Sequence, residues 1–215
     1  MKKFLFVFAF IALTSCNVNS QGTKKTTYYD TGEKKMEYTE VNGEPTGPSV
    51  YYYKSGKKSR EAFFKNAKAE GIMTVYYESG EKQGEATFVN GVQEGEAKQF
   101  FKNGKIDQTS FFKNGKRTGP CTYWYESGTK RADGEFLEDK QHGKWTVWYE
   151  NGNLKDITYW ENDLENGESV RYFENGEKKD EGIWKEGKKV GIWKYYDQNG
   201  KLRETINHDE ENSRK

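Results

Sequence analysis

Aromatic residues recur along the chain at a fixed interval of 24 residues, separated by stretches rich in lysine, glutamate and glycine. The most regular of these positions holds Phe64, Phe88, Phe112, Phe136, Trp160 and Trp184. Elsewhere in the cycle two aromatic residues stand side by side, as at Trp148 and Tyr149. Because side chains alternate between the two faces of a strand, both faces of the predicted sheet are partly apolar. A strict repeat of this length indicates an array of equivalent structural units.

Two glycine series follow the same 24-residue period and divide each repeat into two parts. The first series comprises Gly32, Gly56, Gly80, Gly104, Gly128, Gly152, Gly176 and Gly200. The second lies 15 residues after the first and comprises Gly47, Gly71, Gly95, Gly119, Gly143, Gly167 and Gly191. Asn-Gly and Ser-Gly pairs between aromatic stretches are typical of tight hairpins, because glycine supplies the positive φ that such turns need. Two turns per repeat predict two strands per repeat.

The second turn of the repeat is clearest at Asn90-Gly91 and Asn114-Gly115, and a further strand is expected to leave the second glycine. Pro48 and Pro120 directly follow that glycine, where we expect a bend or the start of a strand, because proline cannot donate to a strand ladder. The predicted fold class is therefore all-β, an elongated single-sheet antiparallel β-meander built from 24-residue hairpin repeats. Propeller blades are longer, a leucine-rich repeat needs its Leu ladder, and charges recur on every strand, which argues against an outer-membrane barrel.

Two segments of the chain resemble the MORN-repeat variant family and, more loosely, MORN repeats proper. They are Phe112–Gly119 with the following Tyr123–Gly128, and Trp184–Trp193. The resemblance extends over residues 28–205 and implies a twisted, elongated antiparallel sheet. About 15 strands at roughly 4.8 Å spacing would give a rod on the order of 70 Å long. Some bacterial members of the family carry the label antitoxin, and MORN repeats are also discussed as phospholipid binders.

The N-terminus has the pattern of an export signal. Lys2 and Lys3 precede an apolar run from Phe4 to Leu13, which is shorter than the about 20 residues of a membrane-spanning helix. Leu13-Thr14-Ser15-Cys16 resembles the lipobox of bacterial lipoproteins, which implies cleavage before Cys16 and lipidation of that residue. A plain secretory signal is the alternative. Since no Asp follows Cys16, we expect a lipid-anchored protein of the cell envelope, preferably on the periplasmic side of the outer membrane.

These features divide the chain into four parts. We expect a lipoprotein signal peptide in residues 1–15 and a lipidated cysteine with a polar tether in residues 16–27. The MORN-variant repeat array, of about seven and a half repeats, is expected in residues 28–206, and a disordered tail in residues 207–215. A cytosolic antitoxin does not agree with such a signal, so that role would require a toxin met outside the inner membrane.

Charge and cysteine content narrow the possible partners. Removal of residues 1–15 takes away two of 35 basic residues, which leaves 33 against 34 acidic ones and changes the net charge from +1 to −1. A near-neutral protein has no general attraction for nucleic acid. With Cys16 lipidated, Cys121 is the only remaining thiol, and its tolerant repeat position indicates packing rather than catalysis. Aromatic residues make up 16% of a chain whose mean hydropathy is −1.13, so we expect aromatic rings and lysine stems to form the core.

The sequence carries no recognisable catalytic or metal-binding pattern. Its only histidines are His142, expected in a surface turn, and His208, expected in the tail. One column of carboxylates comprises Glu37, Glu61, Glu85, Asp133 and Glu181, spaced by about 9.6 Å along the sheet and therefore too far apart to share a metal ion. We expect them to pair with lysines across strands. No cofactor and no enzymatic activity are predicted.

Tryptophan is confined to the C-terminal half of the chain. We select Trp145, Trp148, Trp160, Trp184 and Trp193 as candidate anchors of a binding face, because tryptophan dominates interface hot spots. Thicker packing in this half is the alternative. The resulting hypothesis is a non-enzymatic envelope lipoprotein that acts as a repeat scaffold and binds another macromolecule, most simply a protein. An antitoxin or immunity protein and a glycan- or cell-wall-binding module remain open alternatives.

Overall fold

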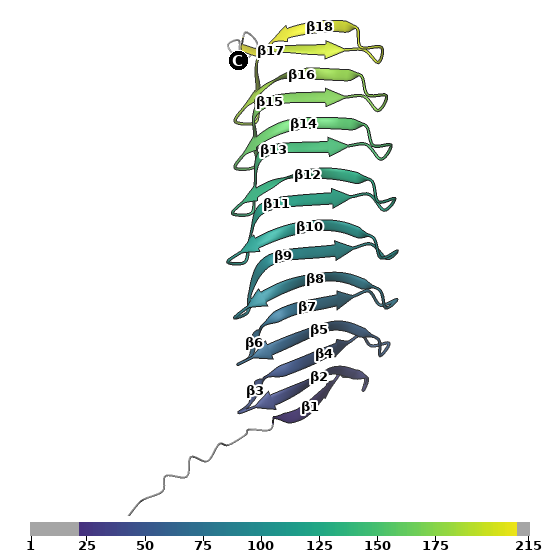
Figure 1. Cartoon of the computed structure of the whole chain (residues 1–215), viewed down its shortest axis with the longest axis vertical. Coiled ribbons are helices and arrows are strands. Elements are labelled where there is room, and N and C mark those ends of the chain that lie inside the picture. Colours follow the sequence, from purple (N-terminus) through teal and green to yellow (C-terminus); the bar gives the residue numbers. More distant parts are fainter. Residues whose placement is uncertain (1–21, 210–215) are drawn as a thin grey trace, which may run out of the picture.

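The computed structural model describes residues 22–209, which form one antiparallel sheet of 18 strands stacked in sequence order (Figure 1). Each hairpin pairs with the next along the chain. The predicted all-β meander is confirmed. The strands are β1 (Thr23–Tyr28), β2 (Lys34–Val41), β3 (Glu44–Pro45), β4 (Gly47–Tyr52), β5 (Lys58–Lys65), β6 (Lys68–Ala69), β7 (Gly71–Tyr76), β8 (Lys82–Val89), β9 (Val92–Phe100), β10 (Ile106–Lys113), β11 (Lys116–Trp124), β12 (Lys130–Leu137), β13 (Lys140–Trp148), β14 (Leu154–Glu161), β15 (Leu164–Tyr172), β16 (Lys178–Lys185), β17 (Lys188–Tyr196) and β18 (Leu202–Asn207).

The sheet begins earlier than the sequence indicates. Residues 23–27, which we expected in the tether, belong to β1 and pair with β2 from Thr23 opposite Glu40 onward. Threonines suit an extended edge strand, and Lys24 and Lys25 place charges on an edge that would otherwise pair with another chain. The signal segment, Cys16 and residues 210–215 lie outside the described part. Nowhere in residues 22–209 does the chain form a helix of the length and apolar character needed to cross a membrane.

Both predicted turns are present in each full repeat. At the first turn the amide of Gly128 donates to the carbonyl of Tyr125 at 2.8 Å, and the amide of Tyr125 donates to the carbonyl of Thr129 at 2.9 Å. At the second turn Asn114 and Gly115 have φ values of 52° and 78°. Two consecutive positive φ values define a type I′ hairpin, whose twist matches that of the strands it joins.

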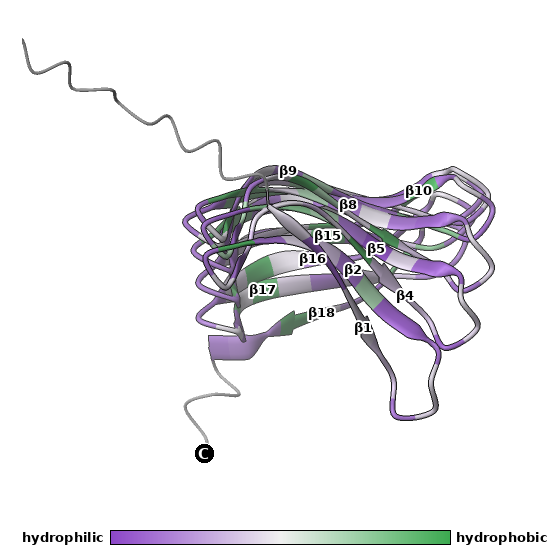
Figure 2. Ribbon diagram, turned by 90° about the horizontal axis from the view of Figure 1, so that it is seen from below, coloured by the Kyte–Doolittle hydropathy of each residue, from purple (hydrophilic) through white to green (hydrophobic). Residues whose placement is uncertain are grey.

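The second glycine series does not form the turns. Gly143 lies inside β13 with a φ of 70°, and the strand register shifts nearby, between Asp133 and Glu135 of the partner strand. This combination is a β-bulge, which bends the strand and increases its twist. Repeated in successive hairpins, the bulges contribute to the arch visible when the sheet is viewed along its length (Figure 2).

Cross-strand pairs define two faces of the sheet. Ser49 pairs with Ala62, and both side chains are buried, whereas the adjacent pair Pro48 and Phe63 is exposed. The same alternation recurs in later repeats, so we call the side that carries Ser49 the packed face and the opposite side the open face. The buried residues of the packed face are Ser49, Ala62, Ser110, Cys121, Phe136, Trp145, Thr158, Ser169, Asp180 and Trp193.

Large residues on the packed face lie over glycines of the preceding strand. Trp145 is 6% exposed and lies against Gly134, and Trp193 is fully buried against Gly182. The Trp145 ring meets Phe136 edge to face at 5.3 Å, and its indole N–H donates to the carbonyl of Glu135 at 3.2 Å. At these two pairs a large ring therefore lies against a residue with no side chain, which allows close packing.

Hydrogen bonds between turns connect successive repeats. A tyrosine at the start of the first turn donates its hydroxyl to the carbonyl 23 residues later, in the next repeat. The five pairs are Tyr29 with Tyr52, Tyr53 with Tyr76, Tyr77 with Phe100, Tyr125 with Trp148, and Tyr149 with Tyr172. The equivalent positions Phe101 and Phe173 have no hydroxyl. Each bond satisfies a carbonyl at the end of a strand and ties one turn to the next.

Candidate binding surfaces

A row of exposed apolar side chains follows the middle of the open face. Its large members come from two repeat positions that lie opposite each other on paired strands. In β15 and β16, for example, Glu168 and Ile183 occupy these two positions, and only Ile183 is apolar. We call this set the open row: Pro48, Phe63, Ile72, Phe111, Pro120, Tyr159, Ile183 and Ile192. Ile72 is 64% exposed and Ile192 is 59% exposed. Apolar side chains aligned along a rod make a surface suited to an extended partner.

The open row is divided by charged residues at the same repeat positions. Glu96, Lys144 and Glu168 are exposed and alternate in sign along the face. Neighbouring repeats are two strands apart, which places equivalent side chains about 9.6 Å from one another. The open face therefore offers apolar contacts at intervals with polar groups between them, the composition common in protein interfaces.

The packed face has a hollow in its N-terminal half. Ala86 on β8 and Ala97 on β9 pair directly, and both are small and only partly buried. Met73, Phe88 and Phe112 stand around them and line an open hollow of about 270 Å³. The equivalent places further along the chain contain Gly134 with Trp145 and Gly182 with Trp193. Small residues alone do not make the hollow, because the equivalent pairs Ser110–Cys121 and Thr158–Ser169 are also small and are buried.

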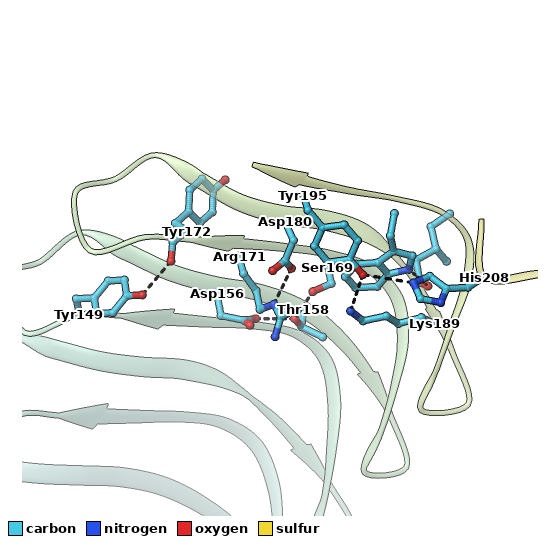
Figure 3. Close-up of polar contacts among 12 residues, drawn as sticks. Tyr149, Asp156, Thr158, Ser169, Arg171, Tyr172, Asp180, Lys189, Tyr195 and His208 are labelled. Atoms are coloured by element: carbon cyan, nitrogen blue, oxygen red, sulfur yellow. Dashed lines mark hydrogen bonds and ion pairs between the residues drawn. The ribbon is translucent and has the colours of Figure 1, made fainter. Parts of the chain in front are cut away.

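Near the C-terminal end the packed face carries a buried polar cluster instead (Figure 3). Arg171 donates to Asp180 at 2.6 Å, and Asp180 is only 2% exposed. Thr158 donates to Asp156 and lies 2.9 Å from the hydroxyl of Ser169. Burial raises the pKa of Asp156, although the Thr158 hydrogen bond and the Arg171 charge partly oppose it. The cluster is internally satisfied, which indicates a structural role.

A second polar group covers Trp193. The Lys189 ammonium lies 4.1 Å from the centre of the Trp193 ring and donates to the Tyr195 hydroxyl at 3.0 Å. That hydroxyl is 3.3 Å from Nε2 of His208 (Figure 3). His208, which we expected in a disordered tail, is thus part of the cap over the last tryptophan.

The structure divides the five candidate anchor tryptophans into two buried residues and three partly exposed ones. Trp145 and Trp193 are buried packing residues, and a buried side chain offers no surface to a partner. Trp160 packs against the cluster of Cys121, Phe136 and Trp145, and Trp184 meets Trp193 edge to face at 5.2 Å. Trp148 lies under the Lys130 ammonium at 5.2 Å. Trp148, Trp160 and Trp184 keep partly exposed rings, and their contact with a partner stays a prediction.

The carboxylate column makes the predicted cross-strand lysine contact at Glu181, which lies 3.8 Å from Lys194 on the paired strand, but its closer lysine contacts are along its own strands. Glu61 binds Lys58 on its own strand and accepts a hydrogen bond from the Tyr76 hydroxyl of a neighbouring strand. These hydrogen bonds, first from Lys58 and then from Tyr76, lower the pKa of Glu61, and the same carboxylate raises the pKa of Tyr76 to about 12. Glu37 with Tyr52 and Glu181 with Tyr196 repeat the arrangement. The column stabilises adjacent strands.

Other candidate chemical groups are accounted for by the fold. His142 is exposed on β13, and Cys121 is 2% exposed in the core. Burial raises the pKa of the Cys121 thiol to about 11, so its thiolate is scarce at neutral pH. Within residues 22–209, His, Cys, Asp and Glu side chains form no group of three that could hold a metal ion. The open row and the hollow were missed from the sequence.

Two of the solved structures that resemble this chain are far larger than it. A Photorhabdus luminescens Tc holotoxin pore is 11% identical over 86% of this chain, with a TM-score of 0.24, and a TcdB2-TccC3 complex is 10% identical over 86%, also with a TM-score of 0.24. This chain spans only 12% and 14% of those chains. At such TM-scores the likeness says nothing about what this chain binds. No curated protein matches the chain.

Family models, in contrast, match the repeats directly. The MORN repeat variant matches residues 45–66, 69–90, 93–114, 141–162 and 189–210, and the MORN repeat matches residues 110–130. The matched segments begin near the second turn of one repeat and extend through the first turn to the following hairpin, in agreement with the strand order. They cover more than half of the chain, which therefore belongs to the MORN repeat variant family.

Proposed function

We propose that the protein is a non-enzymatic repeat scaffold that binds another protein along its open face. The observation that supports this most is the open row, in which residues such as Phe63, Ile72 and Ile192 expose about half or more of their surface. Exposure of such side chains to water is unfavourable in free energy, and a partner can cover them without disturbing contacts inside the fold. A partner that covers the row would gain this apolar burial.

The scaffold is proposed to stand at the cell envelope, held by a lipid on Cys16 after removal of residues 1–15. The support is the Leu13-Thr14-Ser15-Cys16 sequence after an apolar run. β1 begins at Thr23, so only a short segment would separate the lipid from the rigid sheet. A rod anchored at one end would present its open face along its length, preferably in the periplasm from the outer membrane.

The test compares two triple variants that differ only in which open-face side chains they lose. One variant replaces Phe63, Ile72 and Phe111 by Ser, and the matched control replaces Glu96, Lys144 and Glu168 by Ser. Each is expressed as the full chain in its native host, cross-linked in living cells and purified through a C-terminal tag. Circular dichroism first checks that both variants keep the sheet.

The proposal requires a discrete polypeptide that co-purifies with the wild type and the control but is lost from the apolar variant. Losing a hot-spot anchor weakens binding by about 2 kcal/mol or more, roughly 30-fold. Identification of that polypeptide as a toxin would assign the scaffold an immunity role. Recovery of cell-wall glycan without any protein would overturn the protein-binding proposal and favour a glycan-binding module. Equal recovery of a protein with both variants would overturn the open face as its site.

A further inference from the structure

The strand that follows each first turn contains a β-bulge near its start. In β16, Lys178 pairs with Tyr172. The next pair is Asp180 with Arg171, so Lys179 lies between them as the extra residue of the bulge. A bulge re-aims the side chain of this residue relative to its neighbours. The residues in this position, three after each glycine of the first series, are Lys35, Ser59, Gln83, Asp107, Arg131, Lys155, Lys179 and Arg203.

This bulge position carries a positive charge in four successive repeats. We call this set the cation column: Arg131 on β12, Lys155 on β14, Lys179 on β16 and Arg203 on β18. All four side chains are exposed. Equivalent positions in neighbouring repeats are two strands, or about 9.6 Å, apart, so the column follows the sheet over about 29 Å. The three repeats before the column hold the uncharged or acidic residues Ser59, Gln83 and Asp107.

The cations of the column keep their charge uncompensated. None of the ion pairs formed within residues 22–209 includes one of them. The adjacent column differs, since Lys178 pairs with Glu181 at 2.8 Å. Lys155 instead lies 5.5 Å from the centre of the Tyr149 ring. A ring restricts the position of a cation without cancelling its charge, so the column remains able to bind an anion.

The C-terminal end of the column borders an open hollow of about 460 Å³. Lys179 and Arg203 line this hollow together with the rings of Phe173 and Tyr195. Its volume lies within the roughly 300–1,000 Å³ of small-molecule sites, which combine apolar rings with a few placed polar groups. Two cations beside aromatic rings suit a ligand unit that has both an anionic group and an apolar face. An acidic sugar ring has both.

Acidic residues near the column define the direction of approach. Asp180 also lines the hollow, but it is buried and bound by Arg171 at 2.6 Å. Glu204 is exposed there and opposes two positive charges with one negative charge. The neighbouring first turns carry the exposed residues Glu126, Glu150 and Glu174. The surface is therefore positive along the column and negative at the turns, which favours an anion that lies along the column and avoids the turns.

The spacing of the column distinguishes between classes of extended anion. Phosphates follow one another at about 3.4 Å along a strand of duplex nucleic acid. Side chains on one side of an extended peptide follow at roughly 6.7 Å. A polysaccharide of alternating neutral and acidic sugars carries one carboxylate on every second ring, a repeat close to the two-strand spacing of about 9.6 Å. Such a chain can place one carboxylate at each cation.

We propose that the cation column binds an acidic polysaccharide of alternating neutral and acidic sugars. The polysaccharide lies along the column, parallel to the long axis of the sheet, with one carboxylate at each cation. At the C-terminal end one of its sugar rings enters the hollow beside Phe173 and Tyr195. This site is separate from the open row and does not rest on the proposed function.

The proposal is tested by isothermal titration calorimetry of the folded chain with a hyaluronan octasaccharide, which carries a carboxylate on every second sugar. The octasaccharide is expected to bind, and more weakly as salt rises, because salt screens exposed charges. Maltooctaose, a neutral chain of the same length, should bind at least about tenfold more weakly. Absent octasaccharide binding, or equal binding of maltooctaose, would overturn the proposal. Equal or tighter binding of a tetraglutamate peptide would overturn the polysaccharide as the ligand.

Two triple variants with the same change of charge locate the site. The column variant carries Lys155→Gln, Lys179→Gln and Arg203→Gln. The control variant changes three exposed lysines that flank second turns in the same half of the chain, by Lys140→Gln, Lys185→Gln and Lys188→Gln. The column variant should bind the octasaccharide at least about tenfold more weakly, and the control within about twofold of the wild type. An equal loss in both would overturn the column as the site.

Circular dichroism checks that both variants keep the sheet, which is expected because all the replaced side chains are exposed. The variant that lacks Phe63, Ile72 and Phe111 changes only the open face and should bind the octasaccharide like the wild type. Loss of octasaccharide binding in that variant would overturn the placement of the polysaccharide along the column. Failure to recover a partner protein from cells would overturn the scaffold function alone, since calorimetry with the octasaccharide needs no partner.

Discussion

The indole of Trp193 lies so close to Gly182 that a β-carbon added to the glycine would come within 2.3 Å of ring atom Cδ2. Trp145 has the same relationship to Gly134. Residues 22–209 form a single sheet, and these contacts let a large ring lie flat on the neighbouring strand and become buried. The two pairs account for the thickest packing in the C-terminal half.

Replacing Gly182 by Ala is expected to destabilise the fold by about 1–3 kcal/mol, the usual cost of overpacking a core. The φ of Gly182 is not in the left-handed region, so the effect arises from the contact with Trp193 alone. Urea unfolding of the single and double variants measures it. Trp193→Phe in the same chain should recover part of the loss, and strictly additive effects would contradict the contact.

The tyrosine ladder predicts opposite effects at two equivalent positions. Tyr125→Phe removes the hydrogen bond from its hydroxyl to the carbonyl of Trp148 and should cost about 0.5–1.5 kcal/mol. Phe101→Tyr supplies the missing hydroxyl one repeat earlier and should gain up to about the same amount. Thermal unfolding of both variants checks the pair. A loss of stability in Phe101→Tyr would show that the ladder does not extend through that repeat.

The buried thiol predicts slow chemical modification. Burial raises the pKa of the Cys121 thiol to about 11, and the side chain is only 2% exposed. A disulfide reagent at pH 8 should therefore not react with the folded protein. The same reagent should react at once in denaturant. Reaction rates of the mature chain with an aromatic disulfide, with and without urea, make the measurement. Rapid labelling of the native state would contradict the packing of Cys121 between β10 and β12.

The partly buried carboxyl of Asp156 predicts a pH dependence of stability. Burial raises the pKa of Asp156 in the folded chain, so as the pH rises this carboxyl ionises first in the unfolded chain. Above about the ordinary pKa of Asp, this group therefore lowers the free energy of unfolding. Asp156→Asn should therefore raise the melting temperature at pH 7, while its carbonyl still accepts the Thr158 hydroxyl. The difference from wild type should shrink toward pH 3. A variant less stable than wild type at pH 7 would show that the Asp156 charge is needed by Arg171.

Local turn chemistry made most of this fold predictable. The first glycine series marks turns because glycine at Gly128 takes a φ of 98°, and Asn114-Gly115 is a typical type I′ pair. The second series has equally positive φ values but lies in bulges, since the type I′ turn precedes it by four residues. Positive φ alone does not distinguish a turn from a bulge. Strand pairing distinguishes a turn from a bulge, and it depends on residues outside the local segment.

The packing sites were harder to predict because they depend on residues 11 positions apart. Tryptophan composition alone favours a binding face, whereas the glycines at Gly134 and Gly182 show that two rings are core. The open row escaped notice because it alternates with charged residues, and its exposure follows only from the faces that cross-strand pairing assigns.

The most direct test of the scaffold account is site-specific photo-cross-linking in the native host. A photoreactive amino acid replaces Ile72 or Ile192 on the open face, and Glu126 or Glu150, exposed at the first turns, in matched controls. The account predicts one polypeptide adduct from Ile72 and Ile192 that the turn positions do not give. No adduct from the two open-face positions, or the same adducts from all four, would contradict the claim that this face binds a partner.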